Sequence, residues 1–350
     1  MALKGMDGFD LYAIGDITDF WQSNDANSTI VEAAGRCSSY AYRNTGAGGG
    51  GPTIGVDTAE TSGYCGWAYY PEDINGVNIF FVVNTSATGI VFLRSVSSGA
   101  IEFWVGPNTT LGTMIGTTAT GLLATGHYTH LGFEWNIHDT LGYGRIYVEG
   151  IEEYDSGNVD TTDSDSGSTT WVAIKPNPKG YLDDIYWGDT DESDALNPYS
   201  EFLGDLRVEG QFALTDLAGG GGTYDDFTPS ASTDHGALVD ERPPDDGTTY
   251  VEGDTVGETE TFQFPDITLG YGTVIAVQNM PNMVKTDAGS RGITNVMHVG
   301  GTLYDGNIQY GIGETSYRYY PEVFAYNPDT SAAWTADEVN AAENGVQVTL

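Results

Sequence analysis

Two adjacent aspartates in the segment GYLDDIYW are the side chains whose type and spacing first suggest chemistry. Asp183 and Asp184 occupy neighbouring positions of a strand-like pattern, and such neighbours point to opposite faces of a sheet. One carboxylate is therefore expected to face a loop or a cation while the other meets solvent. Because Ca²⁺ takes about six to eight oxygen ligands, a calcium site needs further carboxylates nearby. The candidate calcium ligands are Asp183, Asp184, Asp189 and Asp191.

A purely structural role is the alternative for these aspartates. Carboxylates near turns commonly accept hydrogen bonds from neighbouring backbone N–H groups. The chain also lacks the D-x-D-x-D-G spacing that is typical of a calcium-binding loop. Calcium is therefore the only cofactor that the sequence suggests. A structural role of the same aspartates remains the alternative to calcium binding.

Paired carboxylates could also hydrolyse glycosidic bonds. A retaining mechanism needs two of them about 5 Å apart, and an inverting mechanism needs them further apart. A strand that supplies them carries acids at alternate positions, as in E-x-D-x-x-E, and no such motif occurs. Glu102 and Glu134 are strand carboxylates flanked by aromatics and are expected on a solvent face or a cleft rim. The sequence therefore predicts no enzyme.

Histidines and cysteines show no spacing typical of a metal centre or of a nucleophile with its base. His127 and His130 differ by three positions, which places them on opposite faces of a strand. Cys37 and Cys65 are expected to be small buried residues, or to form one optional bridge.

Aromatic side chains supply the best candidates for a binding surface. Exposed Tyr and Trp can stack on the C–H faces of sugars or anchor a protein partner. Most aromatics of a sandwich lie between its sheets, so only selected ones are expected at the surface. The candidates come from GWAYYPED and from a cluster around one scarce arginine: Trp67, Tyr69, Tyr70, Tyr317, Arg318, Tyr319 and Tyr320.

The elements that must position these residues are short strands. Apolar and polar residues alternate in runs bounded by Gly, Asn, Asp and Pro, which favours antiparallel sandwiches. The runs are Val77–Asn84, Gly89–Ser95, Ala100–Val105, Tyr128–Trp135, Gly144–Val148, Gly180–Trp187, Leu206–Glu209, Glu260–Phe264 and Thr273–Gln278.

One helix is predicted over residues 335–344. Thr335 is a suitable N-cap, Glu338 follows three residues later as in a capping box, and Gly345 stands where a helix would stop. Val339 and Ala342 could supply a small apolar face, so we expect a short helix packed on a sheet.

Charge excludes several partners. The 350 residues include 50 acidic and 12 basic side chains, and the net charge is −38. Such a surface repels nucleic acid and anionic membranes, and no run of Lys and Arg offers phosphate contacts.

No stretch approaches the roughly 18 apolar residues of a membrane helix, and the N-terminus lacks an apolar core of signal-peptide length. We expect synthesis in a cytoplasm without a signal peptide, no membrane insertion and no nucleic acid partner.

Glycine-rich segments suggest the domain limits. Gly219–Gly222 and the proline-rich, charged residues that follow favour an extended crossing. We predict a first domain over residues 1–211, a linker over 212–250, and a β-rich domain over 251–350 that carries the short helix.

An ordered set of segments resembles the laminin-G-like branch of the concanavalin A-like jelly roll. Ser98–Val105 is similar to the strand before the middle of that fold. Gly126–Asp155 is similar to its central block, with Glu149-Gly150 as the hairpin turn. Gly180–Gly188 and Leu203–Val208 are similar to its last two strands. The resemblance implies an all-β protein: an N-terminal concanavalin A-like jelly-roll sandwich and a second C-terminal β-sandwich domain with one short helix.

A narrower resemblance covers the whole chain. The opening Met6–Trp21, the segment VDERPPDDGTTYV, the Gly289–Gly292 segment and the ending AYNPDTSAAWTADEVNAAENGVQV are similar to structural proteins of tailed-phage virions. This resemblance implies that the protein is located in a virion, but it implies little about a ligand or a reaction.

Together with the absence of a catalytic motif, the resemblance implies a non-enzymatic virion structural protein, associated with the tail as fibre, tip or adaptor. It would present lectin-like surfaces for assembly or host attachment. Its expected partners are other virion proteins, further copies of itself, for example in a trimer, and a glycan of the host surface. Capsid decoration as a head fibre, a free carbohydrate-binding module and a glycan-degrading enzyme are the alternatives.

Overall fold

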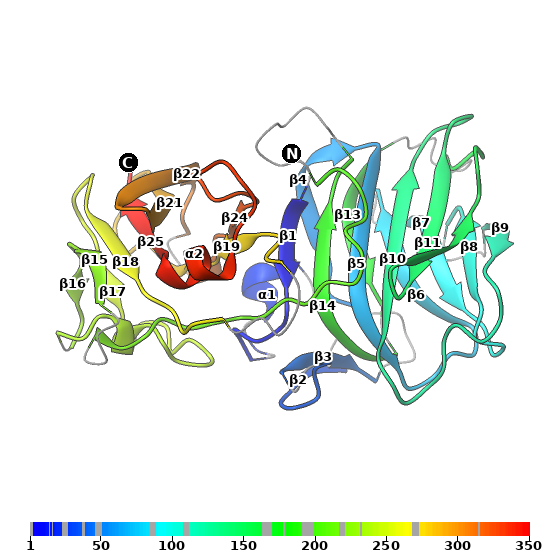
Figure 1. Cartoon of the computed structure of the whole chain (residues 1–350), viewed down its shortest axis with the longest axis horizontal. Helices are drawn as coiled ribbons and strands as arrows, with labels where there is room; N and C mark the ends of the chain where they lie inside the picture. The colour runs from blue at the N-terminus through cyan, green and yellow to red at the C-terminus, as the bar shows by residue number, and fades with distance from the viewer. Residues whose placement is uncertain are drawn as a thin grey trace. The chain divides into compact units, whose positions relative to one another are not determined.

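Two compact units make up the chain (Figure 1). The computed structural model describes residues 3–13, 15, 17–22, 27–36, 39–45, 51–84, 89–107, 112–162, 170–177, 179–190, 199–216, 221–231, 233–267, 273–313 and 316–350. The first unit comprises Met1–Asp10 and Trp21–Glu209, and the second comprises Leu11–Phe20 and Gly210–Leu350. Strands dominate both units, so the prediction of an all-β fold is confirmed.

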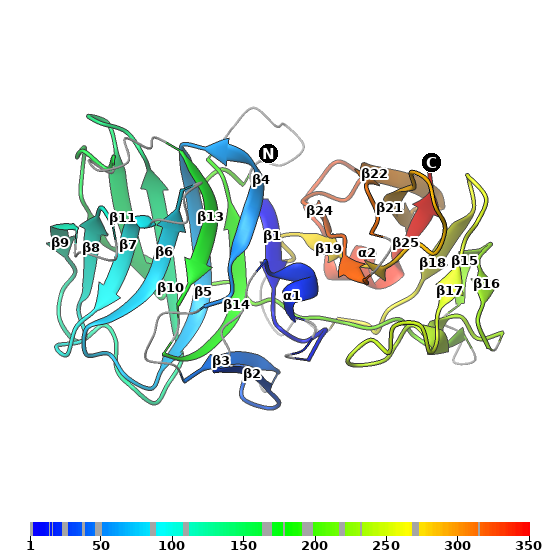
Figure 2. The same ribbon diagram turned by 180° about the vertical axis from the view of Figure 1, so that it is seen from behind.

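Two antiparallel sheets form the first unit (Figure 1, Figure 2). The eight-stranded sheet has the order β12-β11-β10-β5-β14-β3-β2, with β1 paired to β14, and the six-stranded sheet has the order β4-β13-β6-β7-β8-β9. The strands of the eight-stranded sheet are β1 (Leu3–Asp7), β2 (Ser28–Val31), β3 (Ala41–Asn44), β5 (Ser62–Pro71), β10 (Thr129–Asn136), β11 (Tyr143–Val148), β12 (Ile151–Asp155) and β14 (Gly180–Gly188). Those of the six-stranded sheet are β4 (Ile54–Glu60), β6 (Val77–Val83), β7 (Gly89–Ser95), β8 (Ile101–Val105), β9 (Thr113–Thr117) and β13 (Trp171–Pro176).

Aromatic side chains fill the space between these two sheets. Leu131, Phe133 and Trp135 stand at alternate positions of β10, and all three are buried. Phe80 of β6 reaches across from the other sheet, with ring centroids 4.8 Å from Trp67 and 5.9 Å from Phe133. Burial of each such side chain contributes about 1.5–3 kcal/mol, so the strand period places a sandwich core here.

The tight turn between β11 and β12 is the one that the sequence predicts. Glu149 and Gly150 have φ angles of 51° and 77°. Positive φ at both central residues defines the type I′ turn, whose twist matches that of the flanking strands. The predicted Glu149-Gly150 hairpin is therefore confirmed.

The predicted strand over Leu206–Glu209 is wrong. These residues form no ladder in the structure. Their backbone groups bond to side chains instead: Val208 N donates to Asp184 Oδ1 over 2.8 Å, and the Leu206 carbonyl accepts from Arg36 Nη1 over 3.3 Å. The alternation of apolar and polar residues is present, but the segment has no neighbouring strand to pair with.

The second unit contains a five-stranded antiparallel sheet of order β15-β18-β25-β21-β22 and three two-stranded ribbons. The sheet consists of β15 (Gly221–Asp225), β18 (Thr259–Phe262), β21 (Gly292–Val299), β22 (Thr302–Tyr310) and β25 (Glu343–Val348). The ribbons pair β16 (Thr228–Pro229) with β17 (Val251–Glu252), β19 (Val277–Asn279) with β24 (Glu322–Phe324), and β20 (Asn282–Met283) with β23 (Arg318–Tyr319). Residues 212–250, for which the sequence predicts a linker, include β15 and β16.

Helix α2 (Ala336–Ala341) lies where the sequence predicts a helix, and its capping box is formed. Thr335 N donates to Glu338 Oε2 over 2.8 Å. The helix ends at Ala341, however, and the predicted stop at Gly345 is wrong because Gly345 belongs to β25. A Cβ at Gly345 would lie 1.8 Å from the Glu260 carbonyl oxygen, so glycine serves the close approach of two strands. Val339 packs on the core as expected.

The other described helices are very short. Helix α1 spans Ile17–Phe20, which the sequence does not predict, and η2 is a 3-10 turn over Gly236–Leu238. In the described part of the chain, no helix has the length and apolar character needed to cross a membrane.

Candidate functional site

The outer face of the eight-stranded sheet is the face turned away from the six-stranded sheet. Because side chains alternate along a strand, Glu134 of β10 points outward while its neighbours Phe133 and Trp135 point into the core. The strand register places Arg145 of β11 opposite Glu134, and Tyr147 opposite Gly132. The outer face therefore carries tyrosines and charged groups close together.

The outer face holds a connected set of side chains near β12, which we call the tyrosine–arginine patch: Glu134, Tyr143, Arg145, Tyr147 and Asp155. Glu134 Oε1 accepts hydrogen bonds from Tyr143 Oη (2.9 Å) and from Arg145 Nη1 (3.0 Å). Arg145 Nε donates to Asp155 Oδ2 over 3.2 Å, and its guanidinium lies 4.6 Å from the Tyr143 ring centroid. Glu134 is buried, whereas Tyr143, Arg145 and Tyr147 are half-buried and Asp155 is exposed.

These contacts give the patch a fixed geometry. Burial, and then the Glu134 carboxylate, raise the pKa of Tyr143, so its hydroxyl stays protonated and donates at neutral pH. A guanidinium is a planar set of about five N–H donors, more than the two carboxylates of the patch occupy. The patch thus offers oriented donors, acceptors and ring surface on one half-exposed face.

Residues 199–209, which we call the covering segment, cross the same outer face. Phe202 stacks on Tyr147 with ring centroids 4.3 Å apart. Tyr64 Oη donates to the Tyr199 carbonyl over 2.6 Å, and Tyr186 Oη donates to the Gly204 carbonyl over 2.5 Å. The covering segment therefore buries Tyr64 and Tyr186, whereas the tyrosine–arginine patch stays half-exposed beside it.

Glycine at position 132 admits the covering segment. A Cβ there would lie 2.2 Å from Phe202 Cε2, well inside contact distance. The Phe202 ring therefore rests directly on the backbone of β10, a close approach that glycine permits.

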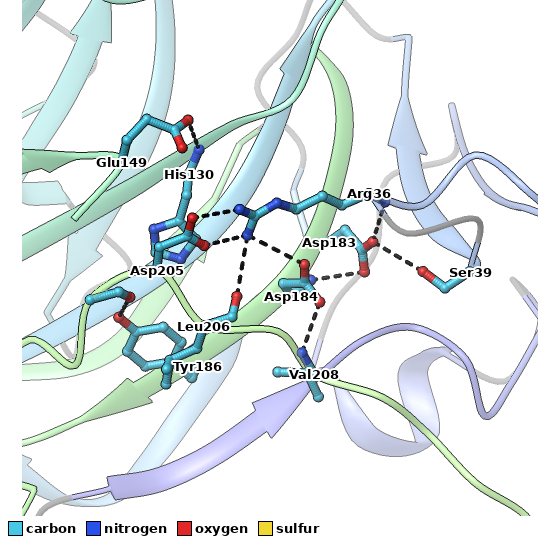
Figure 3. Close-up of polar contacts among 11 residues, drawn as sticks. Arg36, Ser39, His130, Glu149, Asp183, Asp184, Tyr186, Asp205, Leu206 and Val208 are labelled. Carbon is cyan, nitrogen blue, oxygen red and sulfur yellow. Dashed lines mark hydrogen bonds and ion pairs between the residues drawn. The ribbon is translucent and has the colours of Figure 1, made fainter. Parts of the chain in front are cut away.

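Arg36 ties the covering segment to the two adjacent aspartates (Figure 3). Its Nη1 and Nη2 donate to the two carboxylate oxygens of Asp205 over 2.5 and 2.6 Å, and Nη1 lies 3.7 Å from Asp184 Oδ2. A bidentate guanidinium–carboxylate pair is among the stronger and more directional polar contacts in proteins. It fixes the position of Asp205 against the sheet.

Asp183 and Asp184 are both buried, so the expectation that one of them meets solvent is wrong. The physical reason is a bulge in β14 between Asp183 and Tyr186, with Asp184 at a φ of +50°. The bulge breaks the alternation of faces. Asp183 then accepts hydrogen bonds from the backbone N–H groups of Arg36 and Asp184, over 2.7 and 2.8 Å.

Burial raises the pKa of both carboxyls. For Asp183 the neighbouring Asp184 raises the pKa further, whereas for Asp184 the hydrogen bond from Val208 N and the charge of Arg36 oppose the increase. Folding therefore disfavours the simultaneous ionisation of both carboxyls. This pair restrains the covering segment through Arg36 and Val208.

The remaining candidate calcium ligands are Asp189 and Asp191. Asp189 is buried and forms an ion pair with Lys4 Nζ at 2.9 Å, and Asp191 lies outside the described residues. Among the described residues, no three-ligand group includes Asp183, Asp184 or Asp189. Calcium binding at this position stays a prediction.

His130 is a functional candidate that the sequence analysis misses. Its ring lies under the covering segment, stacked near Tyr186 and Phe202 with centroids 6.1 Å from each. Within the described part of the chain, neither ring nitrogen has a hydrogen-bond partner. Burial, only partly offset by Asp205, lowers the pKa of His130 to about 4. No sequence motif marks this residue, because its burial depends on where residues 199–209 run.

The predicted aromatic binding residues of β5 divide between core and surface. Trp67 and Tyr69 are both 1% exposed, so they stabilise the sandwich rather than face a ligand. Tyr70 is half-buried, with T-shaped ring contacts to Tyr128 at 5.4 Å and Tyr181 at 5.3 Å.

The predicted aromatic cluster of the second unit is likewise mixed. Tyr319 is buried, with its ring 5.6 Å from that of Tyr12, while Tyr317 and Tyr320 are half-buried and Arg318 is exposed. A binding role for Tyr70, Tyr317, Arg318 and Tyr320 stays a prediction.

The two cysteines are partly described. Cys65 is a free, buried thiol whose pKa burial raises well above the usual range, and Cys37 lies outside the described residues. The interpretation of Cys65 as a small buried residue is confirmed.

No family model matches the sequence, and no curated protein matches it. Solved structures resemble part of the chain. The galectin LEC-6 of Caenorhabditis elegans is 12% identical with a TM-score of 0.31, over 39% of this chain and 89% of the galectin. A SAP-like pentraxin of Limulus polyphemus is 12% identical with a TM-score of 0.30, over 42% of this chain and 73% of the pentraxin. The CBM40 of a Ruminococcus gnavus IT-sialidase, solved with alpha2,3 sialyllactose, is 7% identical with a TM-score of 0.27, over 37% of this chain and 75% of that chain. At these sequence identities and TM-scores, the function has to be inferred from the side chains of the protein itself.

Proposed function

We propose that this protein is a non-enzymatic glycan-binding protein and that the tyrosine–arginine patch contacts the sugar. The observation that carries the proposal is the arrangement of Arg145. Its guanidinium lies over the Tyr143 ring and bonds to Glu134 and Asp155 on a half-exposed sheet face. Oriented charged groups hydrogen-bond to pairs of hydroxyls, and aromatic rings stack on sugar C–H faces. A sugar offers both features to such a surface.

The ligand class follows from charge. With a net charge of −38, the protein repels polyanionic chains over distances longer than a direct contact. Arg145 is already neutralised by two carboxylates, so it does not add a free positive charge. We therefore propose a neutral glycan that presents vicinal hydroxyl groups.

A glycan-degrading function is less well supported. Hydrolysis needs two carboxylates that flank one bond. Glu102 lies in β8 of the six-stranded sheet and accepts from Trp104 Nε1 over 2.9 Å, whereas Glu134 lies in the other sheet. Asp183 and Asp184 lie close together but are buried. Neither pair brackets an accessible substrate.

Glycan-array binding of the full chain, followed by calorimetry with the best neutral glycan, tests the proposal. Arg145→Gln removes the guanidinium and is expected to weaken binding at least about tenfold, the equivalent of about 1.4 kcal/mol. Arg291→Gln is the matched control, because Arg291 is also a surface arginine with a carboxylate partner, Asp287, but lies in the second unit. Equal affinity of Arg145→Gln and the unaltered chain would contradict the patch, and failure to bind any neutral glycan would contradict the function.

Location in a phage virion, whether tail or capsid, and assembly into a homo-oligomer remain proposals that rest on the resemblance of the sequence. Mass spectrometry of purified particles is the direct measurement. A fixed stoichiometry of this chain in the particles would support that location, and its presence only in the host lysate would rule it out.

A further inference from the structure

Three ligand atoms converge in the second unit, away from the proposed glycan patch. Asp225 ends β15, Glu260 lies in β18, and His235 immediately precedes η2. His235 Nδ1 lies 2.7 Å from Asp225 Oδ1 and 2.8 Å from Glu260 Oε1, and all three atoms are within 4.8 Å of one another. Residues separated by up to 35 positions thus meet at one nitrogen.

The hydrogens available to the imidazole ring show why this arrangement suits a cation. An imidazole Nδ1 carries at most one hydrogen, whether the ring is neutral or protonated. One hydrogen makes one short, well-aligned bond, but two carboxylate oxygens lie within 2.8 Å of the nitrogen. When the ring carries its only proton on Nε2, the Nδ1 lone pair faces both oxygens. A bound metal ion would satisfy all three atoms at once.

The surroundings hold two of these groups in place. Glu260 and His235 are buried. Glu260 Oε2 accepts from Phe227 N over 3.0 Å, and the backbone N–H of His235 donates to Asp216 Oδ2 over 2.6 Å. Such outer contacts orient ligands before the metal arrives.

The third ligand, Asp225, leaves a path from solvent to the cluster. The Asp225 side chain is 68% exposed, so the cluster opens to solvent on that side. An ion can enter past Asp225, and water can complete its coordination.

We propose that Asp225, His235 and Glu260 bind one divalent transition-metal ion. One imidazole nitrogen and two carboxylate oxygens suit Zn²⁺ and its neighbours, whereas Mg²⁺ and Ca²⁺ prefer oxygen ligands alone. Ligand atoms lie about 2.0–2.2 Å from Zn²⁺, so the three side chains need to open only slightly around it. The site is independent of the proposed glycan patch.

Calorimetric titration of the metal-free full chain with ZnCl₂ tests the proposal. In about 0.15 M NaCl, where exposed charges are screened beyond about 8 Å, we expect one Zn²⁺ per chain. Asp225→Asn and His235→Gln should each weaken Zn²⁺ binding at least about tenfold, a change of about 1.4 kcal/mol. Ca²⁺ should not compete at equal concentration.

The matched control is His138→Gln. His138 Nδ1 also lies beside a carboxylate, 2.9 Å from Asp139 Oδ1, but it belongs to no three-ligand group within the described residues. Its Zn²⁺ affinity should be unchanged. Because Asp225 is exposed, Asp225→Asn is expected to fold, which circular dichroism checks. Unchanged Zn²⁺ binding in Asp225→Asn and His235→Gln, or only weak binding of several ions that Ca²⁺ displaces, would overturn the proposal.

Discussion

Single side chains in the first unit depend on a segment that is remote in sequence. His130 is neutral and buried because Phe202 and its neighbours cover it. Arg36 joins Asp205 of that covering segment to Asp184 of β14. Burial shifts the pKa of His130 and of both aspartates, and the charges of Arg36 and Asp205 come from segments remote in sequence.

His130 should make the free energy of unfolding depend on pH. Its pKa is about 4 in the folded chain, against 6.5 when exposed. The unfolded chain therefore binds a proton first, so the stability from His130 is full above about pH 6.5 and is lost as the pH falls toward 4. The loss amounts to roughly 3 kcal/mol. Urea unfolding at several pH values should show a smaller loss in His130→Phe.

His127→Phe is the matched control for that experiment, because His127 is an exposed histidine of the same segment. It should retain the pH dependence of the unaltered chain. An identical acid-induced loss of stability in His130→Phe would contradict the assignment of the effect to His130.

The covering segment acts as an element although it forms no strand. It is held by ring stacking of Phe202, by tyrosine hydroxyls that bond to its carbonyl groups, and by the pair of Arg36 with Asp205. These contacts replace the backbone ladder that holds an ordinary edge strand. The segment should therefore loosen as a local unit when one anchor is removed.

Phe202→Ala tests this behaviour. Loss of a half-buried aromatic ring is expected to destabilise the first unit by roughly 1–3 kcal/mol, less than the cost at a fully buried site. Hydrogen exchange of residues 199–209 should accelerate more than that of β5 or β10. Phe202→Leu keeps most of the apolar contact and should largely restore protection. Equal acceleration throughout the unit would show that the segment does not open separately.

At the scale of the whole molecule, the dominant feature is charge. Fifty acidic side chains against 12 basic ones give a net charge of −38. Like charges on a folded surface repel one another, and this repulsion opposes the compact state. The many ion pairs that the structure shows, such as Arg43 with Glu72, neutralise only a small part of it.

Added salt should therefore stabilise the protein. Screening shortens the Debye length from about 30 Å at 0.01 M to about 10 Å at 0.1 M. Tm, measured by calorimetry at neutral pH, should rise over that range of NaCl. The Asp225→Asn variant, which differs by one charge, should show nearly the same increase. A Tm that is constant or falls with salt would show that ion pairs outweigh the net repulsion.

Local pattern determines much of this protein. Period-two runs locate strands such as β8 and β11, whose residues alternate between buried and half-buried, because alternation along a strand is a property of neighbouring residues. The capping box of Thr335 and the Glu149-Gly150 turn are predictable for the same reason: the interacting groups lie within a few residues.

Only the tertiary structure determines which side chains come together in the candidate sites. Trp67 is part of the core rather than of a sugar-binding surface because Phe80 of the second sheet stacks on it. The bulge at Asp184 arises where β14 pairs with β5. The meeting of Asp225, His235 and Glu260 likewise needs β15 to pair with β18. Contacts between segments far apart in sequence arise from the summed packing of the fold, and no local spacing records them.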